Sequence, residues 1–412
     1  MGLVELDLNL TDEQKAMRDL VRKFGAEVMR PAAIQLDKLA DPEDVIAKDS
    51  VLWEVHRTFR KLGLHRLGYP EEMGGIPSDA MTTCLVFEEM GYAAADLAIS
   101  LQCLTFPFFF AQLSPDPEIQ GWVRQYLEDT EGTKTVGCWA ITEPDHGSDW
   151  LLYDGANVTD PQCGGSVRAV KDGKYYVING QKSAWVSNGT IATHAALFLS
   201  VDSSTGQAGG AVAVVPLDLP GISRGKPLNK LGQRALNQGE IFFDNVRIPE
   251  SMMIISGPDL YGMTIDRVLG SANAGMGVTF AGVARAAFDE ALKYAQERVQ
   301  GGKPIFEHQN IQLKLFKMFT MVEAARSFAR RVQAYNGATG APLLQYSTAS
   351  KVLSTETAFQ VASEAIQIFG GYGLSKDYYI EKIFRDARAA MIEDGVNETL
   401  ALAGAARLGN PA

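Results

Sequence analysis

Three segments of the sequence bring together side chains that could take part in a reaction. The first, residues 138–149 (CWAITEPDHGSD), places hydroxyl, carboxyl and imidazole groups among the Pro and Gly residues of a predicted turn. In the second, residues 184–189 (AWVSNG), Trp185 and Ser187 stand two positions apart and therefore point to the same face of a strand. The third, residues 385–397, carries carboxyl groups near a predicted helix end that a glycine caps. A suitably placed carboxylate can act as a general base.

The sequence lacks the spacings that mark metal centres and the common phosphate-binding loops. Its five histidines form no HExxH or HxH pattern, and none lies a helical turn from a cysteine. No GxGxxG follows a strand, and GxxxxGK and GxSxG are absent. The cysteines lie far apart without a CxxC pair, so we expect reduced thiols at Cys84, Cys103, Cys138 and Cys163. We therefore expect no metal site, and chemistry that depends on an organic cofactor or on side-chain acid–base groups.

The composition is that of a globular protein with an acidic surface. The 412 residues carry 38 basic and 49 acidic side chains, a net charge of −11, and 46% of the residues are hydrophobic. These values exclude a disordered or fibrous chain and argue against nucleic acid or an anionic membrane as the main partner. No apolar run approaches the ~18 residues of a membrane span, and the N-terminus lacks the features of a signal or transit peptide. We expect a soluble cytoplasmic protein.

The hydrophobic period divides the chain into a helical part, a β part and a second helical part. Helical periodicity dominates residues 11–135, where Thr11 and Gln14 form a capping box at the start of the first helix. Short β-rich runs fill residues 136–249 without an intervening helix, which favours a sandwich or barrel over a parallel sheet. From residue 261 the helical period returns, and long helices with short loops indicate an antiparallel bundle.

We expect an α+β architecture of three domains. These are an N-terminal helical domain over residues 1–136, a β-sandwich or barrel domain over residues 137–255 and a C-terminal four-helix bundle over residues 256–412. Within the β domain, Asp172-Gly173 predicts a hairpin turn and Asn179-Gly180 predicts the end of the strand that follows.

The joint order and spacing of these segments resemble the acyl-CoA dehydrogenase family over almost the whole chain. The TEPxxGSD core at residues 142–149 looks like that family's first signature, and WVSN at residues 185–188 is similar to its WITN stretch. Residues 297–309 resemble the segment by which a neighbouring subunit holds the pyrophosphate of FAD, and residues 367–373 resemble the QxxGGxG run on the adenosine side. The resemblance implies the family's three-domain fold and FAD as the cofactor.

The resemblance also implies which residues bind each ligand. The residues expected to bind FAD are Trp139, Ile141, Thr142, Gly147, Ser148, Trp185, Ser187, Arg298, Gln300, Gln309, Gln367, Gly370 and Gly371. The residues expected to line the pocket for an acyl-CoA substrate are Thr105, Phe106, Trp150, Tyr372 and Gly395.

The resemblance assigns Asp394 as the catalytic base. A carboxylate in this family removes the α-proton of an acyl-CoA thioester while a hydride leaves Cβ for flavin N5, and Asp394 stands where the family's EGT motif has Glu. Some members use an alternative base position, which Val268 occupies here and cannot serve. Glu393 is the rival base, but neighbours on a helix point about 100° apart, so we expect only one of the two acids to face the flavin.

The shorter base predicts an unusual substrate. Asp has one methylene fewer than Glu, so its oxygens lie about 1.5 Å nearer the backbone, and a misplacement of about 1 Å can cost on the order of 10²-fold in rate. We therefore expect a cyclic, aryl-substituted or branched acyl-CoA, as in the similar family members that act on cyclohexane-type carboxyl-CoA esters. The resemblance further implies an electron-transferring flavoprotein as partner and a homotetramer.

Three other functions stay open at this point. A nitroalkane-oxidase-like flavoenzyme also uses Asp to remove a carbon-bound proton and is reoxidised by O₂. A second alternative has the same fold but eliminates or desulfinates an acyl-CoA. The third is a non-catalytic flavin-binding scaffold, against which the acid retained at the base position argues.

Overall fold

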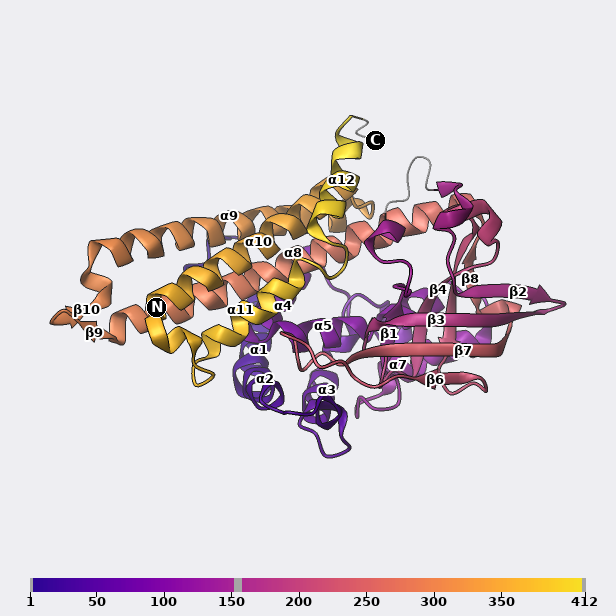
Figure 1. Cartoon of the computed structure of the whole chain (residues 1–412), viewed down its shortest axis with the longest axis horizontal. Helices are drawn as coiled ribbons and strands as arrows, with labels where there is room; N and C mark the ends of the chain where they lie inside the picture. Colours follow the sequence, from indigo (N-terminus) through magenta and orange to yellow (C-terminus); the bar gives the residue numbers. More distant parts are fainter. Residues whose placement is uncertain (1–2, 152–157, 410–412) are drawn as a thin grey trace.

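The computed structural model describes residues 3–151 and 158–409, and its elements follow the predicted order of helices, strands and helices (Figure 1). The capping box is confirmed, because the Gln14 N–H donates to Thr11 Oγ1 at 3.2 Å and the Thr11 N–H donates to Gln14 Oε1 at 3.0 Å. The helices of the first region are α1 (Asp12–Phe24), α2 (Arg30–Asp37), α3 (Leu52–Lys61), α4 (Ala80–Ala93), α5 (Ala95–Cys103), α6 (Phe106–Ala111) and α7 (Pro117–Glu128).

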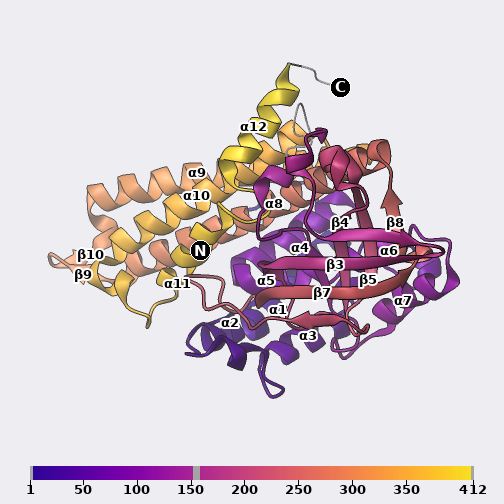
Figure 2. The ribbon, with the colours of Figure 1, turned by 45° about the vertical axis from the view of Figure 1, so that its right-hand side comes forward.

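The second region is an eight-stranded sheet, antiparallel except where β1 and β2 each pair in parallel with β4. The strand order is β6-β7-β3-β2-β4-β5-β8, with β1 beside β4. Figure 2 shows β2, β3 and β7 running side by side. The strands are β1 (Gly137–Ala140), β2 (Arg168–Asp172), β3 (Tyr175–Ser187), β4 (His194–Ser200), β5 (Gly210–Pro216), β6 (Ile222–Arg224), β7 (Gln238–Pro249) and β8 (Met253–Ser256).

One turn prediction in the sheet is confirmed and one is wrong. The hairpin at Asp172-Gly173 is present between β2 and β3. The strand end predicted at Asn179-Gly180 is wrong, because β3 continues to Ser187 with a register shift at this point. Gly180 has a φ of 133°, and a Cβ there would lie 2.8 Å from Val167 Cα. The glycine therefore permits a bulge with a close backbone approach instead of ending the strand.

Long helices form the third region and lie side by side in both ribbon views. Its elements are α8 (Pro258–Glu297), the hairpin of β9 (Val299–Gln300) and β10 (Lys303–Pro304), α9 (Gln309–Thr339), α10 (Leu344–Phe369), α11 (Tyr379–Ala390) and α12 (Asn397–Leu408). Among residues 3–151 and 158–409, no helix is both long and apolar enough to cross a bilayer. The boundaries 1–136, 137–255 and 256–412 stay a prediction.

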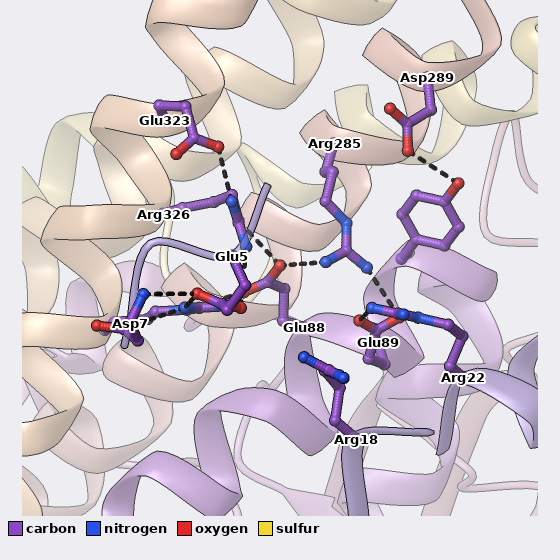
Figure 3. Close-up of polar contacts among 12 residues, drawn as sticks. Glu5, Asp7, Arg18, Arg22, Glu88, Glu89, Arg285, Asp289, Glu323 and Arg326 are labelled. Atoms are coloured by element: carbon purple, nitrogen blue, oxygen red, sulfur yellow. Dashed lines mark hydrogen bonds and ion pairs between the residues drawn. The ribbon is translucent and has the colours of Figure 1, made fainter. Parts of the chain in front are cut away.

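A buried carboxylate ties the first region to the bundle (Figure 3). Glu88 of α4 accepts hydrogen bonds from Arg285 of α8 at 2.5 Å, Arg326 of α9 at 2.9 Å and Arg330 of α9 at 2.8 Å. Arg330 also binds Glu5 at 2.7 Å, so the N-terminal segment joins the same network. Burial alone would raise the pKa of Glu88, but the three guanidinium groups lower it to about 2.

Replacing Glu88 with Ala leaves these guanidinium groups without their shared partner. Breaking a buried ion pair from one side costs about 3–5 kcal/mol, so we expect a loss of that size in the free energy of unfolding, measured by urea titration. The exposed Glu72 gives the matched control, Glu72→Ala, whose free energy of unfolding should change by less than about 0.5 kcal/mol.

The stability of the Glu88→Ala protein should also depend on pH in a different way from that of the unaltered protein. Because the folded pKa of Glu88 lies near 2, below its ordinary value of 4.5, its stabilisation is complete above about pH 4.5 and is lost as the pH falls toward 2. The Glu88→Ala protein should therefore lose less stability over this interval than the unaltered protein. Equal losses, or equal stability at pH 7, would contradict the role of Glu88.

Candidate active site

A cleft of about 830 Å³ lies where the three regions of the fold meet. The end of α5 contributes Ile99 and Cys103 to its wall, the β region contributes the loop after β1 and the end of β3, and the third region contributes the residues after α11. Pockets of about 300–1,000 Å³ typically hold small organic ligands and cofactors. The cleft therefore suits the organic cofactor that the sequence predicts.

The turn after α11 presents two acidic side chains to this cleft. The helix ends at Ala390 with Met391 as its C-cap, so the prediction that Gly395 caps it is wrong. Asp394 and Gly395 have φ values of 51° and 98°, in the left-handed region. Because the chain leaves helical geometry before Glu393, the helical separation of neighbours does not apply, and both acids line the cleft. The expectation that only one of them could face the site is corrected accordingly.

Two contacts from distant parts of the chain hold this turn. The Val396 N–H donates to Ser148 Oγ, in the loop after β1, at 2.9 Å. From α10, Lys351 Nζ donates to the Gly395 carbonyl and to Asn397 Oδ1, both at 2.8 Å. Burial lowers the pKa of Lys351 to about 8, against the opposing effect of nearby carboxyl groups. The position of the turn thus depends on the sheet region and on a buried lysine of the bundle.

The two acids differ in how they are held. Burial raises the pKa of Asp394, although the charge of Lys351 opposes the shift. Burial and the neighbouring Asp394 raise the pKa of Glu393 to about 8, against a hydrogen bond from Gln233 and the charges of Lys351 and Lys230. Gln233 Nε2 donates to Glu393 Oε1 at 2.6 Å, whereas no hydrogen bond ties the Asp394 carboxyl to another described residue. Both carboxyl oxygens of Asp394 are therefore available to a ligand, whereas Glu393 has one oxygen engaged by Gln233.

Three sequence profiles of one family match successive parts of the chain. They are described as "Acyl-CoA dehydrogenase, N-terminal domain" at residues 11–108, "Acyl-CoA dehydrogenase, middle domain" at residues 138–246 and "Acyl-CoA dehydrogenase, C-terminal domain" at residues 264–409. The chain belongs to the acyl-CoA dehydrogenase family. It is an FAD-dependent oxidoreductase that acts on CH–CH bonds, as the resemblance of its motifs implies.

Relatives and a solved structure cover nearly the whole chain. Cyclohex-1-ene-1-carbonyl-CoA dehydrogenase of Geobacter metallireducens is 31% identical over 95% of this chain and 96% of its own. Cyclohexane-1-carbonyl-CoA dehydrogenase of the same organism is 30% identical over 95% of this chain and 96% of its own. The structure of butyryl-CoA dehydrogenase from Megasphaera elsdenii has a TM-score of 0.85 at 27% identity and covers 98% of this chain and 100% of that one. These matches confirm the predicted fold class.

One group of the residues predicted to bind FAD lines the cleft together with Asp394. Two of them stand near the end of β3, where Ser187 Oγ accepts a hydrogen bond from Gln238 Nε2 at 3.2 Å and the Trp185 side chain is 57% exposed. The members of this group are Trp139, Ile141, Thr142, Gly147, Ser148, Trp185 and Ser187.

The cleft wall fits the flat isoalloxazine ring of FAD. Trp185 offers a largely exposed aromatic face, which suits stacking against a ring system. The indole nitrogen of Trp139 is buried and has no hydrogen-bond partner among the described residues. A ring with polar edges would use both features, so these residues would hold FAD beside Asp394.

A second group of predicted FAD residues lies elsewhere, at the end of the bundle that carries the β9–β10 hairpin. Figure 1 shows this hairpin at the opposite end of the molecule from the sheet. There the Arg298 guanidinium lies 5.6 Å from the ring centroid of Tyr372. The residues of this group are not among those that line the described cleft; they are Arg298, Gln300, Gln309, Gln367, Gly370 and Gly371. Their role in binding FAD stays a prediction.

Of the predicted pocket residues, the structure brings only Gly395 to the described cleft. Thr105 Oγ1 instead pairs with the Tyr69 hydroxyl at 2.7 Å, and the Phe106 ring packs 4.6 Å from that of Trp139. Trp150 is buried and its indole N–H donates to a backbone carbonyl at 3.1 Å. The fifth, Tyr372, lies at the far end of the bundle beside Arg298.

Several residues that line the cleft or hold its turn are not among the predicted site residues. Ile99 and Cys103 line the wall and stand four positions apart, a spacing that puts both on one helix face and could have been read from the sequence. The contacts of Lys351 and Gln233 with the turn could not be predicted, because they join residues 44 and 160 positions apart in the chain.

Replacing Gly395 with Ala should displace the neighbouring Asp394 carboxyl group. The new Cβ would meet Leu400 Cδ2 at 2.8 Å and Leu151 Cδ1 at 2.9 Å, on a backbone with a φ of 98°. A shift of about 1 Å can cost on the order of 10²-fold in rate, so we expect a fall of that size in the rate of flavin bleaching by substrate.

The matched control is Gly121→Ala in α7, where a Cβ meets nothing within 4 Å. Its bleaching rate should equal that of the unaltered protein. A Gly395→Ala rate within threefold of this control (about 0.6 kcal/mol) would show that the conformation of the turn does not control the bleaching rate.

Proposed function

We propose that the chain desaturates a cyclic, aryl-substituted or branched acyl-CoA thioester between Cα and Cβ, with Asp394 as the base. The observation that carries the proposal is the left-handed turn at Asp394. It presents to the cleft a carboxyl group that has a raised pKa and no hydrogen-bond partner in the described part of the chain. A carboxylate with a raised pKa is a stronger base, which favours proton transfer from a weak carbon acid.

The same turn supplies a second element of the reaction. The α-proton of a thioester leaves only if the enolate that develops is stabilised by donors aimed at the thioester oxygen. The backbone N–H of Asp394 donates to no other described residue and is available for this contact. When bound, FAD accepts the hydride that leaves Cβ. The chain holds the substrate and takes the α-proton on Asp394.

Two features support a bulky acyl group. Asp394 is shorter than the Glu that the family usually carries, so Cα must come closer to the backbone. The two Geobacter metallireducens relatives are named for ring-bearing acyl groups. Apolar side chains line the part of the cleft that a ring would fill; they are Ile99, Ile141, Leu151 and Leu269.

We also propose a homotetramer and an electron-transferring flavoprotein as the electron acceptor. The two groups of predicted FAD residues lie apart in one chain, so one cofactor could use both only where a second copy brings its bundle end to the cleft (Figure 1). The acceptor is supported by membership of the family.

Asp394→Asn removes the base while keeping the shape of the side chain. We expect the rate of anaerobic flavin bleaching by an acyl-CoA to fall by at least about 10²-fold, while the protein stays folded and yellow. The exposed Asp12→Asn variant is the control and should bleach at the unaltered rate. Retained bleaching in Asp394→Asn would remove Asp394 from the role of base.

The substrate class can be tested with paired CoA esters. We expect cyclohexane-1-carbonyl-CoA to bleach the flavin at least about tenfold faster than butyryl-CoA or octanoyl-CoA, and Asp394→Glu to shift this ratio toward the straight chains because the longer side chain restores reach. A preference for straight chains would contradict the proposed substrate. Indifference to every CoA ester, with rapid peroxide formation from nitroalkanes, would contradict the proposed reaction.

A further inference from the structure

The carboxyl group of Glu393 is fixed in the cleft by a side-chain amide that is itself held rigidly. Gln233 Nε2 donates to Glu393 Oε1 at 2.6 Å and to the Asp386 carbonyl at 3.3 Å, and the Gln233 backbone N–H donates to Asp386 Oδ1 at 2.5 Å. A carbonyl oxygen only accepts, so the contact with Asp386 fixes which end of the amide faces Glu393. Glu393 Oε1 is therefore an acceptor, and a proton on this carboxyl group must sit on Oε2.

The two lysines near Glu393 do not form hydrogen bonds with it. Lys351 Nζ is committed to the Gly395 carbonyl and Asn397 Oδ1. Lys230 Nζ donates to the Leu236 carbonyl at 2.6 Å and to Gln238 Oε1 at 2.7 Å. Neither cation therefore forms a hydrogen bond with the Glu393 carboxyl group, whose hydrogen-bond partner among the described residues is the amide of Gln233.

Two carboxyl groups that line one cleft do not both ionise readily, because like charges at short range repel. Burial and Asp394 raise the pKa of Glu393 to about 8. The groups that face Glu393 are Asp394 from its own turn, Lys351 from α10, Lys230 from the loop before β7 and, through Gln233, Asp386 from α11. The other ionisable side chains that line the cleft are Cys103, Glu143, Asp145, His146, Glu240, Arg385 and Arg388.

We propose that Glu393 is a positioning residue that holds the one proton of the pair on its Oε2, so that the single negative charge of the two acids resides on Asp394. This inference rests on the proposed function, in which Asp394 is the base. When Asp394 takes the α-proton, the pair holds two protons, and the one on Asp394 is returned to solvent after product leaves. Loss of the Glu393 proton at high pH puts a second negative charge beside the developing enolate and opposes it.

The pH profile of flavin bleaching tests this assignment. In the unaltered holoenzyme we expect bleaching by cyclohexane-1-carbonyl-CoA to fall as the pH rises through about 8, the pKa of Glu393. Glu393→Gln keeps the shape of the side chain and stays neutral at every pH, so the fall of the bleaching rate at high pH (the falling limb of the pH profile) should disappear. At pH 7 its bleaching rate should lie within about tenfold of the unaltered rate (about 1.4 kcal/mol). The exposed Glu398→Gln on α12 is the matched control and should keep the limb.

A variant at Gln233 should shift the falling limb of the pH profile without replacing either acid. The hydrogen bond from Gln233 lowers the pKa of Glu393, so Gln233→Met, of similar length, should move the falling limb to higher pH. Lys351 and Lys230 also have pKa values lowered to about 8. A limb that came from either lysine would persist in Glu393→Gln, and that result would overturn the proposal.

Infrared spectroscopy of the same proteins observes the proton directly. A protonated carboxyl C=O band should be present in the unaltered holoenzyme at pH 7, absent from Glu393→Gln, and lost as the pH rises through about 8. A band that survives in Glu393→Gln would place the proton elsewhere and contradict the inference.

The outcomes separate this inference from the proposed function. Loss of bleaching in Asp394→Asn together with an unchanged limb in Glu393→Gln keeps Asp394 as the base and rejects the role of Glu393. Loss of bleaching at every pH in a folded Glu393→Gln protein, with activity retained in Asp394→Asn, would make Glu393 the base. That result rejects Asp394 as the base and Glu393 as a positioning residue.

Discussion

The left-handed turn at Asp394 and Gly395 is the constraint on which the site depends. A residue other than glycine rarely adopts this backbone conformation and persists there only when its surroundings hold it. Here the turn is held by Ser148 of the β region, which accepts from the Val396 N–H, and by Lys351 of the bundle, which donates to the Gly395 carbonyl. The Asp394 carboxyl group therefore keeps its place only while the sheet and the bundle stay in contact, which links the fold to the proposed chemistry.

Buried ion pairs also hold elements of the fold together elsewhere in the molecule. Glu88 of α4 accepts hydrogen bonds from arginines of two bundle helices, α8 and α9. Under the loop after β1, Lys182 Nζ donates to Glu143 Oε1 at 2.7 Å with both side chains fully buried, and Glu143 also accepts a backbone N–H of Ser166 at 2.5 Å. Charges removed from water in this way are costly to break from one side. They hold in register the elements that enclose the cleft.

Local signals in the sequence predicted much of this architecture, and long-range contacts explain what they missed. The capping box at Thr11 and the hairpin at Asp172-Gly173 are short-range features, and both are present. Gly395 was expected to cap a helix, yet the helix ends at Ala390 because the turn is held from outside by Ser148 and Lys351. A helix end and a left-handed loop have the same local composition, so only tertiary contacts distinguish them.

The residues of the candidate site show the same difference between local sequence signals and long-range contacts. Motif order led to Asp394 and to the residues of the loop after β1 and the end of β3, which do meet at one cleft. Gln233 and Lys351 are not among the predicted site residues, and their importance follows from what they contact across the fold. Spacing on α5 pointed to Ile99 and Cys103 only once the direction of that helix face was known.

Crystals of the reduced holoenzyme with cyclohexane-1-carbonyl-CoA bound would locate the substrate α-carbon relative to the two acids. If Asp394 is the base, one of its carboxyl oxygens should lie within about 3–3.5 Å of Cα, the distance of a near-attack conformer. An α-carbon that lies nearer to Glu393 than to Asp394, or out of reach of both, would contradict this role of Asp394.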